Sequence, residues 1–118
     1  MSVDYNNLTK QQAYEHIRHY FTRPGARLSR GLDRCYYRHP DDGRACAVGC
    51  LIPDELYNPD MEGRSAHSVL TRDLGWDDDL AVFLGAAQRK HDSANDVADF
   101  LLRLDALADE QTDLTVIA

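Results

Sequence analysis

The sequence predicts an α+β domain, in which about four or five helices pack on a small antiparallel β-hairpin or sheet. Apolar residues recur at helical spacing toward both ends of the chain, whereas the middle combines tyrosines with a Pro and Gly turn. The length of 118 residues and the hydrophobic content of 43% suffice for one domain with its own core. We therefore expect a single domain over residues 1–118, with residues 111–118 as a loose tail or, at 114–117, an added strand.

The first helix is expected over residues 10 to 21 or 22. Thr9 and Gln12 stand at the spacing of a capping box, in which each side chain bonds the backbone N–H of the other residue. Pro24 and Gly25 are expected to end this helix, because neither residue continues a helix well. The expected buried face consists of Ala13, Ile17, Tyr20 and Phe21, with Tyr14 beside it.

The middle of the chain is expected to form a hairpin. Tyr36 and Tyr37 favour a strand over residues 33–38, since aromatic side chains fit a pleated surface. Residues 39–43, His-Pro-Asp-Asp-Gly, are typical of a turn. A second strand over residues 44–47 then completes the hairpin.

The apolar run at residues 46–52 suits either a buried strand or a short buried helix. We expect it to begin as a strand and to become a helical turn near Gly49. Pro53 lacks a backbone N–H and suits the first turn of a helix, so a short helix is expected over residues 53–57.

The remainder of the chain is expected to be helical. Ser65 is placed to cap a helix that ends before Gly75, which suits the left-handed conformation after a helix. Asp77 is expected to cap the next helix, and Ser93 or Asn95 to begin the last one. The three expected buried faces are Val69, Leu70 and Leu74; Leu80, Phe83, Leu84, Ala87 and His91; and Val97, Phe100, Leu101, Leu104, Leu107 and Ala108.

The composition argues against two classes of partner. A net charge of −7 opposes general binding to nucleic acid, which needs clustered cations. The sequence has no apolar run of about 18 residues, which a membrane helix requires, and its first residues do not resemble a secretory signal. We therefore expect a cytoplasmic protein that uses neither a membrane nor nucleic acid as its partner.

The charges are distributed unevenly along the chain. Residues 1–52 carry eight Lys or Arg against five Asp or Glu, and residues 53–118 carry five against fifteen. Such asymmetry is compatible with an anion-binding front half and an acidic back half. It is equally compatible with halves that face each other or are simply solvated, which is the commoner case.

The three cysteines, together with one of the five histidines, suggest a metal site as an alternative. Cys35, His39, Cys46 and Cys50 are spaced as C-x3-H-x6-C-x3-C, and four such ligands can surround a tetrahedral zinc ion. The spacing lacks the close C-x2-C pairs of zinc ribbons, and free cysteines are often buried in cores. The sequence therefore favours buried thiols and no cofactor, with a small zinc-stabilised binding module as the alternative.

A second alternative is a cysteine-dependent hydrolase or transferase. Cys46 is expected near the start of a helical turn, where a helix dipole lowers the pKa of a thiol. His67 or His91 would then act as the base. Because the sequence places neither histidine beside the thiol, a protein without catalytic activity is favoured.

A protein interface is the favoured kind of site. Tyrosine and arginine supply much of the binding energy in protein interfaces, and both are frequent around the expected hairpin. Aromatic and basic strands also bind single-stranded nucleic acid, but the net negative charge opposes that interpretation. The predicted contact surface consists of Tyr36, Arg38, Arg44, Asp54, Glu55, Tyr57, Met61 and Glu62.

The stretch CAVGCLIPDELY at residues 46–57, followed by MEG at 61–63, resembles a family of short uncharacterised proteins from tailed phages, prophages and bacterial genomes. In that family a similar stretch follows a Tyr-Arg pair, a loop and a glycine, here Tyr37, Arg38 and Gly43, and the cysteine at position 50 is replaceable by alanine. The resemblance implies a phage or mobile-element context, in which small acidic proteins commonly act on host proteins. It leads us to expect a phage-type protein that binds a host or phage protein.

Overall fold

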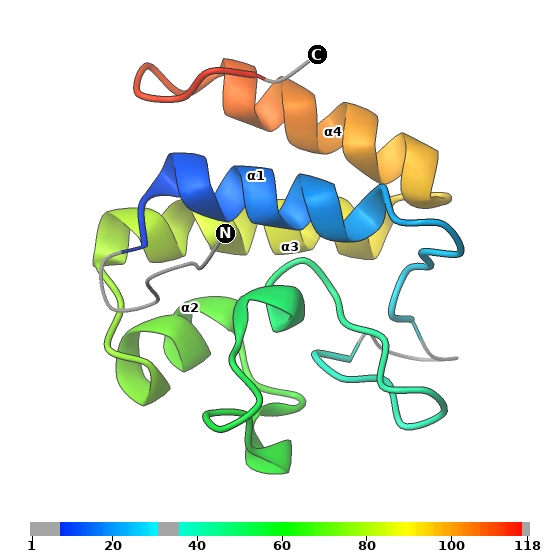
Figure 1. Ribbon diagram of the computed structural model, residues 1–118. Helices are drawn as coiled ribbons and strands as arrows, with labels where there is room; N and C mark the ends of the chain where they lie inside the picture. The colour runs from blue at the N-terminus through cyan, green and yellow to red at the C-terminus, as the bar shows by residue number, and fades with distance from the viewer. Residues whose placement is uncertain (1–7, 31–35, 117–118) are drawn as a thin grey trace.

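The computed structural model describes residues 8–30 and 36–116, and the regular elements in these residues are helices apart from one isolated bridge. Helix α1 packs on both α3 and α4, while α2 packs on α3 (Figure 1). Helix α2 continues directly into a π-helical turn, η4. The elements are α1 Lys10–Phe21, the 3-10 turns η2 Gly49–Leu51 and η3 Pro59–Met61, α2 Ala66–Ser68, η4 Val69–Asp73, α3 Asp78–Ser93 and α4 Val97–Asp109.

The predicted hairpin is wrong, and with it the α+β fold class. Within the described residues, strand pairing is limited to an isolated antiparallel bridge between Arg38 and Ala45; residues 33–35 of the predicted first strand lie outside them. The physical reason is that several backbone N–H groups of this segment donate to side chains instead of to a neighbouring strand. The acceptors are Glu62 for Tyr37 and Arg38, the Tyr20 hydroxyl for Ala45, and Gln88 for Val48.

Helix α1 begins with the predicted capping box. The Thr9 hydroxyl accepts from the Gln12 N–H, and the Gln12 side chain accepts from the Thr9 N–H. Its buried face includes Tyr14 in place of the predicted Tyr20, and α1 contacts two helices as well as η2. Tyr14 is fully buried rather than beside the face and donates to Asp105 of α4 at 2.7 Å, whereas Tyr20 is only partly buried.

The segment between residues 46 and 63 turns repeatedly instead of forming a strand and a helix. The helical turn predicted near Gly49 is confirmed by η2, but the residues before it form a turn rather than a strand. Residues 53–57 close one turn, in which the N–H groups of Leu56 and Tyr57 bond to the Pro53 carbonyl. This turn does not extend into a helix, because Asn58 is extended and its side chain caps η3.

The caps of the later helices follow the sequence closely. Ser65 accepts from the N–H of Ser68, and Asp77 accepts from two N–H groups at the start of α3, as predicted. Gly75 has the expected positive φ of 69°. The start of the last helix differs: α3 runs to Ser93, and Asp96 is the cap of α4.

The core lies between α1, α3 and α4, extends to buried residues in and around η2, η3 and η4, and contains a cluster of three rings. Phe21 and Phe100 lie edge to face with centroids 4.9 Å apart, and the ring of His91 contacts both. Residues 114–116 form no strand, and Thr115 exchanges two hydrogen bonds with the side chain of Gln11 on α1. Within residues 8–30 and 36–116, no helix combines the length and the apolar character needed to cross a membrane.

Candidate functional site

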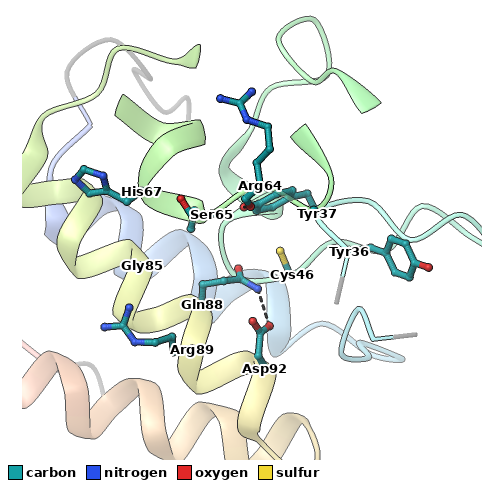
Figure 2. A pocket seen from close by; sticks show the side chains of 12 residues that line it. Tyr36, Tyr37, Cys46, Arg64, Ser65, His67, Gly85, Gln88, Arg89 and Asp92 are labelled. Atoms are coloured by element: carbon teal, nitrogen blue, oxygen red, sulfur yellow. Dashed lines mark hydrogen bonds between the residues drawn. The ribbon is translucent and has the colours of Figure 1, made fainter. Parts of the chain in front are cut away.

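A cavity of about 380 Å³ lies between the chain around Tyr37 and Cys46, residues 63–67 and one side of α3. Figure 2 shows Cys46, Gln88 and Asp92 near its centre, with His67 set well apart from Cys46. Arg64 and Arg89 also line it, so the cavity combines a buried thiol with charged groups at its rim.

A hydrogen-bonded chain that includes two lining residues of this cavity, Gln88 and Asp92, fixes the position of His91. The backbone N–H of Ser29 donates to His91 Nε2 at 3.1 Å, which places the ring proton on Nδ1. Nδ1 then donates to Asp92 at 3.0 Å, and Gln88 Nε2 donates to the same oxygen at 2.8 Å. Gln88 Oε1 accepts the N–H of Val48, so both ends of this side chain are engaged. His91 is therefore a fully buried structural residue, and its Nε2 is not directed to a thiol.

Of the two cysteines in the described residues, Cys46 is buried and Cys50 is partly buried, and the pKa of each thiol is raised. Cys46 accepts the N–H of Gly49, and burial raises the pKa of its thiol to about 12. Burial also raises the pKa of Cys50 well above its ordinary value, and this thiol donates to the Ala47 carbonyl. His67 contacts Asp78 at 2.6 Å. The structure thus brings neither His67 nor His91 to Cys46 in the arrangement that a nucleophile and its base require.

Alkylation of the folded protein should label Cys46 far more slowly than a free cysteine. A pKa near 12 leaves roughly three orders of magnitude less thiolate at pH 8 than the ordinary value of 9.0 does. The measurement is iodoacetamide labelling between pH 6 and 10, quantified for each cysteine by peptide mass spectrometry, with urea-unfolded protein as the reference. Rapid labelling of Cys46 in folded protein below pH 8 would contradict the assignment of a structural thiol.

The proposed zinc ligands are not gathered where the structure describes them. Both ring nitrogens of His39 are engaged by the backbone, since Nδ1 accepts from the Asp41 N–H and Nε2 contacts the Arg30 carbonyl at 3.1 Å. In the described part of the chain, no group of three or more His, Cys, Asp or Glu is placed to hold a metal ion. The fourth proposed ligand, Cys35, lies outside the described residues.

The predicted contact surface contains an anchor that holds the loop of residues 53–63. The Glu62 carboxylate accepts from the backbone N–H groups of Tyr37 at 2.9 Å and Arg38 at 3.0 Å, and from the Tyr57 hydroxyl at 2.6 Å. Burial, together with this bond to Glu62, raises the pKa of Tyr57 to about 12. The loop is thereby tied to the preceding segment by one carboxylate.

Arg38 adds a second tie to the same loop. Its guanidinium lies 4.9 Å from the centre of the Tyr57 ring, a cation–π distance. The same group donates to Asp54 at 2.8 Å and to the Ile52 carbonyl at 2.7 Å. Four of the residues predicted for the surface, Arg38, Asp54, Tyr57 and Glu62, therefore converge at the base of the loop.

The other predicted surface residues have different positions. Met61 is buried, and its side chain joins the loop to the hydrophobic core. Arg44 bonds to Asp42 and to the Leu28 carbonyl, and Glu55 is exposed. The ring of Tyr36 lies 5.0 Å from that of His39 and is turned away from the cavity in Figure 2.

Leu56 is a surface residue that sequence reasoning missed. It exposes 49% of its surface in the turn between Pro53 and Tyr57. The feature of the sequence that could have indicated its exposure is its position directly after two acidic residues, Asp54 and Glu55.

The chain matches no protein-family model, no curated protein and no solved structure.

Proposed function

We propose that this chain works by binding a protein partner through the loop of residues 53–63 and the adjoining residues 36–44. The observation that carries the proposal is a loop held at its base by Glu62 and Arg38 while Leu56 and Glu55 stay exposed. A loop that is already ordered loses less conformational entropy when it binds. Irregular segments on a rigid scaffold are also where binding residues concentrate.

The chemistry of the cysteines supports binding rather than catalysis. Both described thiols are protonated and bonded to the backbone, and the two candidate histidines have other partners. The resemblance of residues 46–63 to short phage and prophage proteins supports a cytoplasmic partner in a bacterial host. The net charge of −7 disfavours nucleic acid as that partner.

The proposal is tested by affinity capture with a matched control. Leu56→Asp alters the loop, and Leu102→Asp alters an equally apolar residue that exposes 72% of its surface on α4. Figure 1 places α4 on the opposite side of α1 from the loop, so the two variants probe different faces. The tagged wild-type chain and both variants are incubated with lysate of the bacterium that carries the gene, and the captured proteins are identified by mass spectrometry.

We expect the Leu56→Asp chain to lose a partner that both other chains retain. Loss of a residue that contributes about 1.4 kcal/mol at the centre of an interface raises the dissociation constant about tenfold, and we expect this change for the purified partner. Circular dichroism of each variant verifies that it is folded. Equal affinity of the wild type and Leu56→Asp for every captured protein would remove the loop from the proposal.

A further inference from the structure

A second cavity, of about 590 Å³, opens beside the 53–63 loop and gathers arginines from distant parts of the chain. Arg23 follows α1, whereas Arg38 and Arg44 flank the turn at residues 39–43. His16 and Tyr20 of α1 complete this side of the cavity. It therefore collects three guanidinium groups in a protein whose net charge is −7.

Two of these arginines are held firmly. The side chain of Arg44 is only 15% exposed, and that of Arg38 is 25% exposed. Arg44 donates to the Leu28 carbonyl and Arg38 to the Ile52 carbonyl, so the backbone fixes both groups. A guanidinium that is already positioned loses little freedom when it binds a carboxylate.

The third arginine, Arg23, contacts an aromatic ring instead of a carboxylate of the described residues. The guanidinium of Arg23 lies 3.9 Å from the centre of the Tyr20 ring, and its Nε donates to the Tyr20 carbonyl. Within the described residues Arg23 has no carboxylate partner, whereas Arg38 pairs with Asp54 and Arg44 with Asp42. The described lining of this cavity thus contains three arginines and two aspartates.

We infer that this cavity binds carboxylate side chains from an acidic segment of the protein partner, an inference that rests on the proposed function and specifies the chemistry of that partner. Asp42 and Asp54 demonstrate that carboxylates fit these guanidinium groups. The side chain of Asp54 is 92% exposed, so it can leave Arg38 and be replaced by a carboxylate of the partner. Because Asp54 belongs to the 53–63 loop and also lines the cavity, a partner that contacts Leu56 would lie next to the cavity.

The inference is tested with a peptide of six glutamates, added to the full ¹⁵N-labelled chain and followed by NMR. The backbone amides of Gly43 and Gly49, which line the cavity, are the reporters. We expect both signals to shift on titration, and the affinity to fall as salt increases. A peptide of six glutamines, which has the same length without charge, should leave both signals in place.

Three variants separate the effect of charge from an effect on folding. Arg23→Gln removes the charge of an exposed residue and should weaken peptide binding roughly two- to fivefold. Asp54→Asn removes the competing carboxylate and should strengthen binding by a similar factor, which damage to the fold would not do. Arg89→Gln, a change of equal charge at the other cavity, should leave the affinity unchanged.

Several outcomes would overturn the inference. The first is that the Gly43 and Gly49 signals do not change when the glutamate peptide is added. The second is that Asp54→Asn does not increase the affinity for this peptide. The third is that inorganic phosphate or hexathymidylate saturates the same signals at a lower concentration than the peptide does. If Leu56→Asp still abolishes partner capture in that case, the proposed function stands without this site. If the peptide binds as expected while Leu56→Asp captures normally, the carboxylate site stands and the loop surface fails.

Discussion

Replacement of Gly49 by alanine should destabilise the protein by about 3 kcal/mol or more. A Cβ atom at this position would overlap the carbonyl oxygen of Tyr37 and lie 2.8 Å from the carbonyl carbon of the same residue. Both are backbone atoms, so no side-chain rotation relieves the overlap. Gly49 does not have a positive φ, which means that the position requires glycine for space and not for its backbone conformation.

Gly85→Ala on α3 is the matched control for this prediction. A Cβ there would meet nothing closer than a guanidinium nitrogen of Arg89 at 3.9 Å. Since alanine favours a helix more than glycine does, this control should stabilise the protein by about 0.5 to 1 kcal/mol. Urea unfolding followed by circular dichroism measures both changes. A free energy of unfolding for Gly49→Ala within about 1 kcal/mol of wild type would refute the tight contact between η2 and Tyr37.

The helices were predictable from the sequence, whereas the irregular path of residues 36–48, where a hairpin was expected, was not. The caps at Thr9, Ser65 and Asp77 depend on residues two or three positions away, which a local pattern reveals. Four backbone N–H groups within residues 36–48 donate instead to remote side chains. Glu62 lies 25 residues from Tyr37, and Gln88 lies 40 residues from Val48. No short-range pattern in the sequence marks these residues as acceptors for that segment.

The burial of Cys46 was predictable from the sequence, whereas the role of Glu62 and the arginine-lined cavity were not. The preference for buried thiols rested on the apolar surroundings of Cys46, and the structure places this residue in the core. The role of Glu62 as an anchor depends on two backbone groups and a hydroxyl that only the folded chain brings together. The arginine-lined cavity likewise needs the end of α1 to lie beside η2, although the excess of arginine in the first half was visible in the sequence.

Glu62→Ala should lower the free energy of unfolding by about 2 to 4 kcal/mol and should release the 53–63 loop. A hydrogen bond to a charged group contributes about 1.5 to 3 kcal/mol, and the three that Glu62 accepts act together, so their contributions are not additive. The variant leaves the N–H groups of Tyr37 and Arg38 without their acceptor. Amide hydrogen exchange should therefore accelerate at these two residues more than in α3 or α4.

Glu55→Ala is the matched control, because it removes the same side chain from an exposed position of the same loop. It should change stability by less than about 0.5 kcal/mol. Glu62→Gln should have an effect between those of the two alanine variants, because its amide keeps one acceptor oxygen and places a donor where the second oxygen stood. If the loop must be ordered to bind, Glu62→Ala should also weaken partner capture, even though this variant keeps the contact residue Leu56. Unchanged exchange at Tyr37 and Arg38 in Glu62→Ala would show that the loop is held by Arg38 and Met61 instead.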